Sequence, residues 1–212
     1  MVLNTALPDS RQHRQDPRSI MARLSAAASR FDGSKLTSNQ PHTKLPPLPD
    51  SNFLRLLANS HAAMEGYAAF EAALAHGQLS ARQRQQIALA VAEINGSKYC
   101  LSAHYAAAKR YGLSEEEIRF ARRATASDPQ TDAMLRFAQG VTLQRGDFSD
   151  ADFLSLRRAG ITDSQIAEIV ANVALSIFAN YFNTVARTDV DFPLLKPGYD
   201  APLNSAAPAP QQ

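Results

Sequence analysis

The sequence contains a single cysteine, Cys100, and no tryptophan. One cysteine excludes an intramolecular disulfide and is typical of the reducing cytoplasm, where we expect this protein to be located. No apolar run approaches the roughly 18 residues that a membrane-spanning helix needs, so we expect no membrane partner. The first residues lack an apolar segment followed by a small-residue cleavage site, so no secretory signal is expected.

Sequence motifs of several large enzyme classes are also missing. There is no glycine-rich phosphate loop, no dinucleotide-binding fingerprint and no Gly-x-Ser-x-Gly nucleophile elbow. One cysteine and five scattered histidines give no recognisable spacing for a structural zinc site. We therefore expect neither a metal ion nor another cofactor.

Positive charge and proline are concentrated toward the ends of the chain. Residues 1–48 carry seven Lys or Arg and three Asp, a net charge of +4, whereas the whole chain carries +2. This basic leader has Phe31 as its only aromatic residue, so nucleic-acid binding is not expected. We predict that the leader is mostly disordered, with at most a weak helix near 19–30, and that the Pro/Ala-rich tail at 194–212 is disordered too.

Residues 49–193 have the pattern of one helical domain. Apolar residues recur at the i, i+3, i+4 spacing of a helix face, and no alternation typical of strands is found. Helix N-caps are predicted at Ser80, Ser114, Asp128, Ser149 and Thr162, and left-handed glycines that end helices at Gly77, Gly112, Gly146 and Gly160. The predicted fold is all-α, with helices near 51–59, 60–76, 80–95, 97–111, 114–125, 129–145, 150–159 and 163–187.

The last predicted helix is apolar on more than one face near its end, where the sequence reads LSIFANYF. A small core covers one face of a helix, so the pattern favours either a central position or contact with a second subunit. Asn180, Asn183 and Arg187 share one face of this helix. We expect them to line either a pocket or a subunit interface, with a structural role favoured.

The stretch INGSKYCLSAHYAAAKRYG, residues 94–112, concentrates the reactive side chains. Gly96 interrupts one helix and Ser97 is the predicted N-cap of the next, which places Cys100 in its first turn. The helix N-terminus favours a negative sulfur, and His104 lies one turn further on the same face, where its imidazole can reach the thiol. Both effects predict a lowered thiol pKa and a nucleophilic thiolate, although most lone cysteines are buried and inert.

Two segments carry a resemblance to a known family. Residues 79–118 read LSARQRQQIALAVAEINGSKYCLSAHYAAAKRYGLSEEEI, which resembles the core of the carboxymuconolactone decarboxylase and alkylhydroperoxidase AhpD-like family. Residues 179–193, ANYFNTVARTDVDFP, are similar to the closing segment of its peroxidase-related branch. The resemblance implies an all-α fold, a homo-oligomer and, in typical members, a Cys-x-x-Cys and His site that reduces organic hydroperoxides. In those members a glutamate twelve residues before the first cysteine completes a proton relay.

On this resemblance, two of the four motif positions depart from the family pattern. Cys100 matches the second cysteine and His104 the relay histidine, and these are the catalytic residues that the resemblance implies. Ser97 stands at the first cysteine and Gln85 at the glutamate. A serine cannot form a disulfide, and a glutamine cannot shuttle a proton at neutral pH, so both are supporting or degenerate relay positions. Tyr99 is a third supporting position, expected to pack with its hydroxyl in solvent.

The sequence leaves two main functions open. In the first, the protein is an impaired hydroperoxide reductase, in which Cys100 becomes a sulfenic acid and an external thiol restores it. In the second, it is a catalytically degenerate family member that keeps the fold for assembly or for binding a small molecule. A redox-independent reaction on a small acid, as in decarboxylase members, is also open, but no residue set supports it. The changes at Ser97 and Gln85 fit natural divergence and engineered inactivation equally well.

Overall fold

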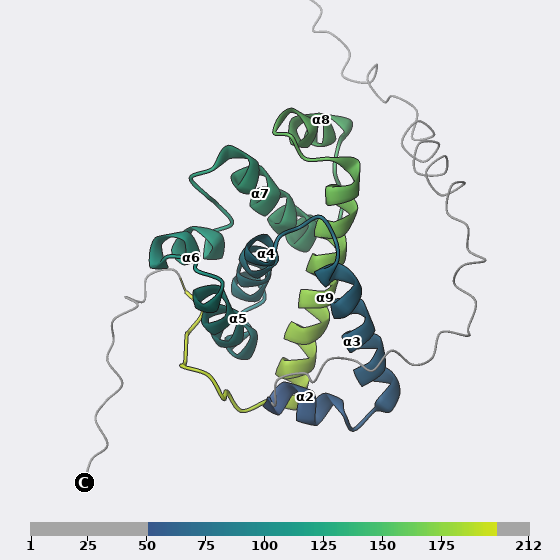
Figure 1. Cartoon of the computed structure of the whole chain (residues 1–212), viewed down its shortest axis with the longest axis vertical. Helices are drawn as coiled ribbons and strands as arrows, with labels where there is room; N and C mark the ends of the chain where they lie inside the picture. The colour runs from purple at the N-terminus through teal and green to yellow at the C-terminus, as the bar shows by residue number, and fades with distance from the viewer. Residues whose placement is uncertain (1–50, 199–212) are drawn as a thin grey trace, which may run out of the picture. The chain divides into compact units, whose positions relative to one another are not determined.

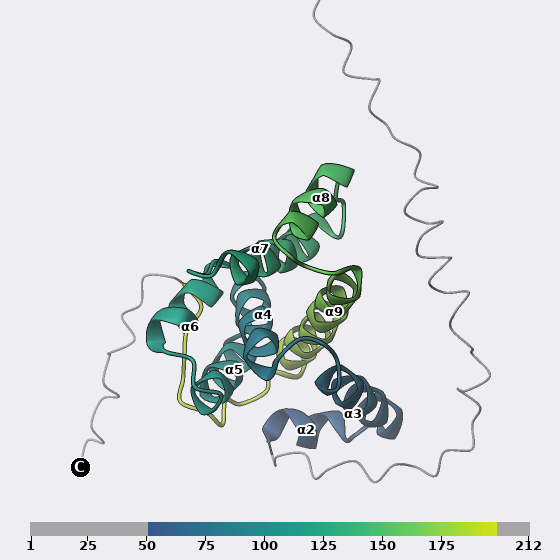
Figure 2. The ribbon, with the colours of Figure 1, turned by 45° about the horizontal axis from the view of Figure 1, so that its top comes forward.

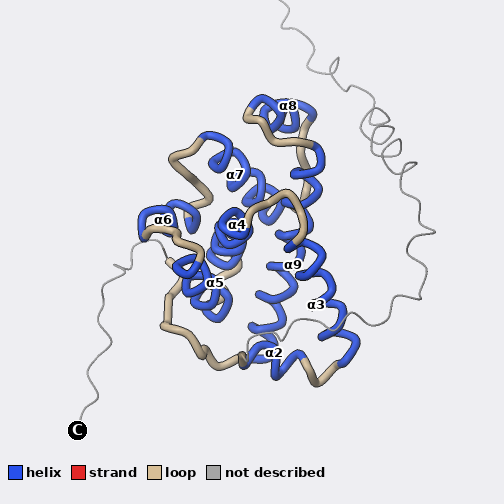
Figure 3. The backbone as a smooth tube through the Cα atoms, in the orientation of Figure 1, coloured by secondary structure: helices blue, strands red, loops and turns tan. Residues whose placement is uncertain are grey.

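Residues 51–198, which the computed structural model describes, fold into α-helices and contain no strand (Figure 3). The helices are α2 (Asn52–Leu57), α3 (His61–Ala75), α4 (Ala81–Ile94), α5 (Lys98–Arg110), α6 (Glu115–Arg122), α7 (Pro129–Gln144), α8 (Asp150–Arg158) and α9 (Asp163–Ala186). The predicted all-α fold is confirmed, and each predicted helix is present. The predictions for the leader at 1–48, its weak helix near 19–30 and the tail from 199 onward fall outside the described residues.

Side-chain capping explains why the helix starts could be predicted. Reciprocal capping boxes begin α4, α6, α8 and α9 at Ser80, Ser114, Ser149 and Thr162. Asp128 caps α7 ahead of a proline, as predicted. Three of the four predicted left-handed glycines adopt that conformation, namely Gly112, Gly146 and Gly160.

Gly77 does not adopt the predicted left-handed conformation. Its small size serves a close approach instead, because a Cβ at this position would collide with the carboxylate of Glu168 on α9. That carboxylate accepts hydrogen bonds from the backbone N–H groups of Gln78 and Leu79. Glu168 therefore ties the connection between α3 and α4 to α9, a long-range contact that a local glycine pattern does not reveal.

Helix α4 lies in the middle of the helices and packs against α5, α6, α7 and α9 (Figures 1 and 2). Its residues from 86 to 93 are all buried, and the side chains of Ile87, Leu89 and Val91 are completely inaccessible. Full burial of each such side chain contributes about 1.5–3 kcal/mol to folding. Because α5 and α9 both pack against α4 and also contact each other, their positions relative to one another are fixed.

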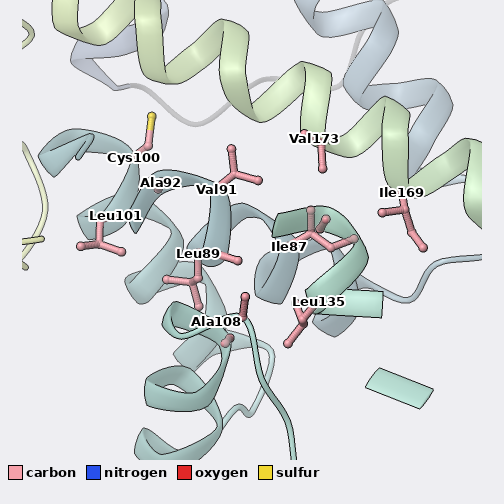
Figure 4. Packing of buried hydrophobic residues seen from close by; sticks show 14 of the residues in the cluster. Ile87, Leu89, Val91, Ala92, Cys100, Leu101, Ala108, Leu135, Ile169 and Val173 are labelled. Atoms are coloured by element: carbon pink, nitrogen blue, oxygen red, sulfur yellow. The ribbon is translucent and has the colours of Figure 1, made fainter. Parts of the chain in front are cut away.

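Helix α9 is buried along one face and leaves large apolar residues exposed along another, so contact with a second subunit stays a prediction. Ile169 and Val173 are buried against the core (Figure 4). The large apolar residues that α9 leaves exposed are Val170, Phe178, Tyr181 and Val185. By length and composition α9 could also cross a membrane, contrary to the expectation that no segment is apolar enough, although the core helix of a soluble protein meets the same criterion.

A buried ion pair joins α4 to α6 and holds the end of the described chain. Nε of Arg122 lies 2.8 Å from Oε2 of Glu93, and both side chains are only 3% exposed. Nη2 of Arg122 also donates to the backbone carbonyls of Lys196 and Gly198, while Oε1 of Glu93 accepts the N–H of Gly198. These backbone groups satisfy the remaining polar atoms of the pair, as a buried ion pair requires.

The described structure continues past residue 193, where the sequence places the start of the tail. Leu195 is buried, and its N–H donates to Oγ of Ser102 on α5 at 2.9 Å. An extended segment that is fixed through its backbone has no periodic apolar signature. This is why the sequence pattern ends the domain a few residues early.

We predict that Arg122→Leu lowers the free energy of unfolding by about 3–5 kcal/mol, because it leaves the Glu93 carboxylate buried without a cation. The measurement is urea denaturation followed by circular dichroism. Arg157→Leu is the matched control, since its ion pair with Asp163 is exposed and should contribute less than about 1 kcal/mol. The double variant Glu93→Leu/Arg122→Leu should recover part of the loss; a double variant no more stable than Arg122→Leu would contradict this explanation.

Candidate functional site

The connection between α4 and α5 places the thiol at the start of α5. Gly96 has a φ of +64°, a left-handed conformation that lets the chain turn sharply between the two helices. Ser97 is the N-cap of α5, and its Oγ lies 3.5 Å from the backbone nitrogen of Cys100. The predicted cap and the predicted place of Cys100 in the first turn are both confirmed.

The sulfur of Cys100 is enclosed between α5 and α9. The residue is 3% exposed, and its sulfur points toward α9 (Figure 4). Nδ2 of Asn183, on α9, donates a hydrogen bond to Sγ at 3.3 Å. The thiol therefore has a polar partner from a helix that is distant in sequence.

The predicted lowering of the thiol pKa is wrong. Burial raises the pKa of Cys100 above its ordinary value of 9.0, and this effect outweighs the nearby polar groups of Ser97, Asn183 and Asn180, which lower it. Transferring a thiolate from water into the protein interior costs more free energy than the helix N-terminus and these polar groups contribute. The sequence shows the helix start, but it does not show that α9 covers the sulfur.

His104 forms a hydrogen bond with Gln85 rather than with the thiol. Its Nδ1 lies 2.9 Å from Oε1 of Gln85, on α4. Because a carbonyl oxygen can only accept, Nδ1 carries the proton and Nε2 is unprotonated. Burial lowers the pKa of His104 to about 4, so the ring is neutral at pH 7. Within the described helices, Cys100 and His104 share no hydrogen bond, which corrects the expectation that the imidazole reaches the thiol.

Tyr99 has a structural position. It is 5% exposed, and its hydroxyl accepts the backbone N–H of Phe53 at 3.1 Å. Its ring packs edge-on against Phe192, with centroids 5.7 Å apart. Burial raises its pKa to about 12, which disfavours an acid–base role. The residue packs, as expected, but its hydroxyl is fixed inside the protein rather than lying in solvent.

Two asparagines of α9 complete the surroundings of the sulfur. Asn183 is 4% exposed and Asn180 is fully buried; Oδ1 of Asn180 accepts a hydrogen bond from Nδ2 of Asn95 at 3.1 Å. Arg187, the third residue of the predicted face, is exposed and ends α9 in a left-handed conformation. The signal for the two buried residues was present in the sequence, since asparagine is unusual within an apolar helix, but the pattern did not connect them with Cys100.

No set of three or more His, Cys, Asp and Glu residues in the described part of the chain is arranged to hold a metal ion. One small cavity, lined in part by Leu79, Met134 and Ile169, has a volume of about 10 Å³. It has room for about one water molecule, and its lining includes none of the candidate site residues on α4, α5 or the C-terminal half of α9 described above. The candidate site is therefore the thiol, its amide partners and the neighbouring pair of Gln85 and His104.

Comparison with known structures identifies the same helical fold in other proteins. An uncharacterized peroxidase-related protein from a Silicibacter species is 23% identical, with a TM-score of 0.61 over 82% of this chain and 87% of its own. A second such protein, described as an alkylhydroperoxidase AhpD core, from Ralstonia eutropha, is 24% identical, with a TM-score of 0.58 over 80% and 83%. The debrominase Bmp8 is 18% identical, with a TM-score of 0.59 over 66% and 77%. At these identities the likeness shows a shared fold.

Sequence comparison gives the family. No curated protein sequence matches the chain significantly. Residues 61–143, a range that contains Gln85, Ser97, Cys100 and His104, match the carboxymuconolactone decarboxylase family. This match identifies residues 61–143 as a segment of the carboxymuconolactone decarboxylase family, and the helical fold around it is the one shared with the peroxidase-related proteins.

Proposed function

We propose that the protein is a slow, thiol-dependent reductase of small hydroperoxides that works through Cys100 alone. The observation that supports this best is the convergence of donors from two helices on one sulfur. Asn183 of α9 donates to Sγ at 3.3 Å, and Ser97 and Asn180 also favour the ionised sulfur. Such donors lower the thiol pKa and so favour the anionic form of the sulfur, which is the nucleophile.

The reaction needs one protein sulfur and two external thiols. The thiolate attacks one oxygen of the hydroperoxide, an S–O bond forms, the O–O bond breaks, and the alcohol leaves with a proton. The sulfur is oxidised by two electrons to a sulfenic acid. An external thiol then forms a mixed disulfide with Cys100 and releases water, and a second one restores the thiol. The resolver must be external because the neighbouring motif position is Ser97.

His104 and Gln85 account for the proposed slowness. The unprotonated Nε2 of His104 is the group we propose as the base for the thiol proton, and because the two groups share no hydrogen bond in this structure, we propose that the proton passes through one water molecule. A ring with a pKa of about 4 is a weak base, and the amide of Gln85 cannot take the proton onward. Burial also keeps the thiol largely protonated. We propose a small hydroperoxide and an external thiol as partners, and the reducing cytoplasm as the location.

A second function is favoured by the same burial. The 3% exposure of Cys100 and its raised pKa are typical of an inert structural cysteine. In that case the protein is a catalytically degenerate member that keeps the fold for assembly or small-molecule binding. The two proposals differ in whether any peroxide is consumed at the expense of this sulfur.

We predict that the protein consumes cumene hydroperoxide in the presence of dithiothreitol and that Cys100→Ala abolishes this activity. The rate should rise with pH and continue to rise above pH 9.0, because the thiolate fraction follows the raised pKa of the thiol. The measurement is peroxide loss over a pH series for both proteins. Equal background rates in the two would leave only the second function.

We predict that Ser97→Cys/Gln85→Glu raises the peroxidase rate by about 100-fold, since it supplies a resolving thiol and a proton-relay carboxylate. The new carboxylate should also raise the pKa of His104 from about 4 into the range of about 5–7, because it stabilises the imidazolium. The pKa is measured by NMR titration of the ring protons.

Gln83→Glu is the matched control for this charge change. It adds a carboxylate to the same helix, where Gln83 already accepts the N–H of Ser80, so the capping bond is kept. It should leave both the rate and the His104 titration unchanged. If the double variant gains no activity while its His104 titration does move, the assignment of Ser97 to the first cysteine position is wrong.

We also propose that the protein assembles with copies of itself through the exposed apolar face of α9. Tyr181 is 59% exposed and Val185 is 84% exposed, which is unfavourable for apolar residues left in water. Tyr181→Asp/Val185→Asp should shift the protein toward the monomer in sedimentation velocity. Leu143→Asp, at a 61% exposed position on α7, is the control and should change nothing. A wild-type protein that sediments as a monomer would refute this proposal.

A further inference from the structure

We propose that Asn180 and Asn183 form an amide subsite that positions the oxygen atom of an oxidised Cys100. In this role they are positioning residues, and the ligand is the sulfenate formed on the protein's own sulfur. The proposal rests on the proposed peroxidase function and adds to it a site for the oxygen that the peroxide leaves behind.

The first step concerns the orientation of Asn183. Its Nδ2 donates both to Sγ of Cys100 at 3.3 Å and to the backbone carbonyl of Ala179 at 2.9 Å. The carbonyl one turn earlier on α9 therefore fixes the side chain, and the second hydrogen points at the sulfur. This amide is already in place before any chemistry occurs at Cys100.

The second step concerns Asn180, which lies one turn before Asn183 on the same face of α9. The residue is completely buried. Asn95 donates to its Oδ1 and so fixes the amide orientation, while its Nδ2 has no hydrogen-bond partner among the described residues. A buried donor without a partner is rare in folded proteins and indicates an acceptor that is present in another state of the site.

The third step identifies that acceptor. A thiol sulfur is a weak acceptor, and in the reduced site it takes the donor of Asn183 while the donor of Asn180 has no partner among the described residues. Oxidation follows Cys–SH + ROOH → Cys–SOH + ROH, which adds one oxygen to the sulfur and releases the alcohol. The new oxygen, once ionised, is a strong acceptor that extends one bond length beyond Sγ. The unpaired Nδ2 of Asn180 is the donor that would receive it.

Asn172 provides an internal comparison on the same helix. It is buried, and its Nδ2 donates to the backbone carbonyl of Glu168 at 2.8 Å, as Asn183 does to Ala179. It has no hydrogen bond to the thiol within the described structure. A variant of Asn172 therefore reproduces the loss of a buried helix asparagine without touching the sulfur.

The test follows the sulfenic acid directly. Wild type, Asn180→Ala, Asn183→Ala and Asn172→Ala are oxidised with one equivalent of cumene hydroperoxide without thiol, and then trapped with dimedone after increasing delays. Intact-protein mass spectrometry gives the lifetime of the dimedone-reactive sulfur. We expect the lifetime to fall about tenfold or more in Asn180→Ala, because a hydrogen bond to a charged oxygen is lost, and to stay unchanged in Asn172→Ala.

A second readout tests Asn183 without peroxide. The pH dependence of iodoacetamide alkylation of Cys100 should move to higher pH in Asn183→Ala and should not move in Asn172→Ala. Asn180→Leu, which keeps the branched heavy-atom skeleton but has no donor, replaces Asn180→Ala in both measurements if the alanine variant does not fold, as judged by circular dichroism.

The outcomes separate the two proposals. Equal lifetimes in wild type and the Asn180 variant, with normal labelling in both, would overturn the amide subsite and leave the peroxidase function standing. An absence of dimedone label in wild type, together with no peroxide consumption, would overturn both. A lifetime that is shortened in the Asn180 variant and unchanged in the Asn172→Ala control supports the subsite.

Discussion

The enclosure of α4 on every side is the constraint on which the rest of the structure depends. A helix whose residues from 86 to 93 are all buried must be surrounded, and α5, α6, α7 and α9 supply the cover (Figure 2). This arrangement brings the start of α5 against the end of α9. The thiol of Cys100 thus contacts Asn183 because α5 and α9 both cover the apolar helix α4. The surroundings of the sulfur are a result of core packing.

These surroundings have two opposing effects on the ionisation of the sulfur. Enclosure excludes water and disfavours a charge, while Ser97 and the amides of α9 favour one. Burial is the larger effect, so the resting thiol is neutral. His104 is in a parallel situation, because burial keeps its ring neutral and its partner Gln85 has no charge with which to compensate. Both groups are thus poised in their uncharged forms, which distinguishes this site from one with a carboxylate relay.

Local sequence was sufficient for the helices and insufficient for the site. The hydroxyls of caps such as Ser97 and Thr162 accept the backbone N–H three residues further on, so their signals lie within a short window of sequence. The hydrogen bond from Asn183 to the thiol and the anchoring of Gly198 by Glu93 join residues more than seventy positions apart, which no local pattern contains. Gly77 shows the same limit, since the close neighbour that its small size accommodates is Glu168, on a helix distant in sequence. The family resemblance placed Gln85 beside His104, whereas the amides of α9 became visible as partners of the thiol only in three dimensions.

The ion pair of Glu93 and Arg122 has a consequence for the order of events during protein synthesis. Its remaining polar atoms are satisfied by the backbone at 196 and 198, and Glu93 and Gly198 are 105 positions apart. When the residues of α4 and α6 have left the ribosome, the groups that complete this pair have not yet been made. The helices therefore acquire these buried hydrogen bonds only after residue 198 has left the ribosome, and until then the polar atoms that the backbone groups satisfy stay hydrated.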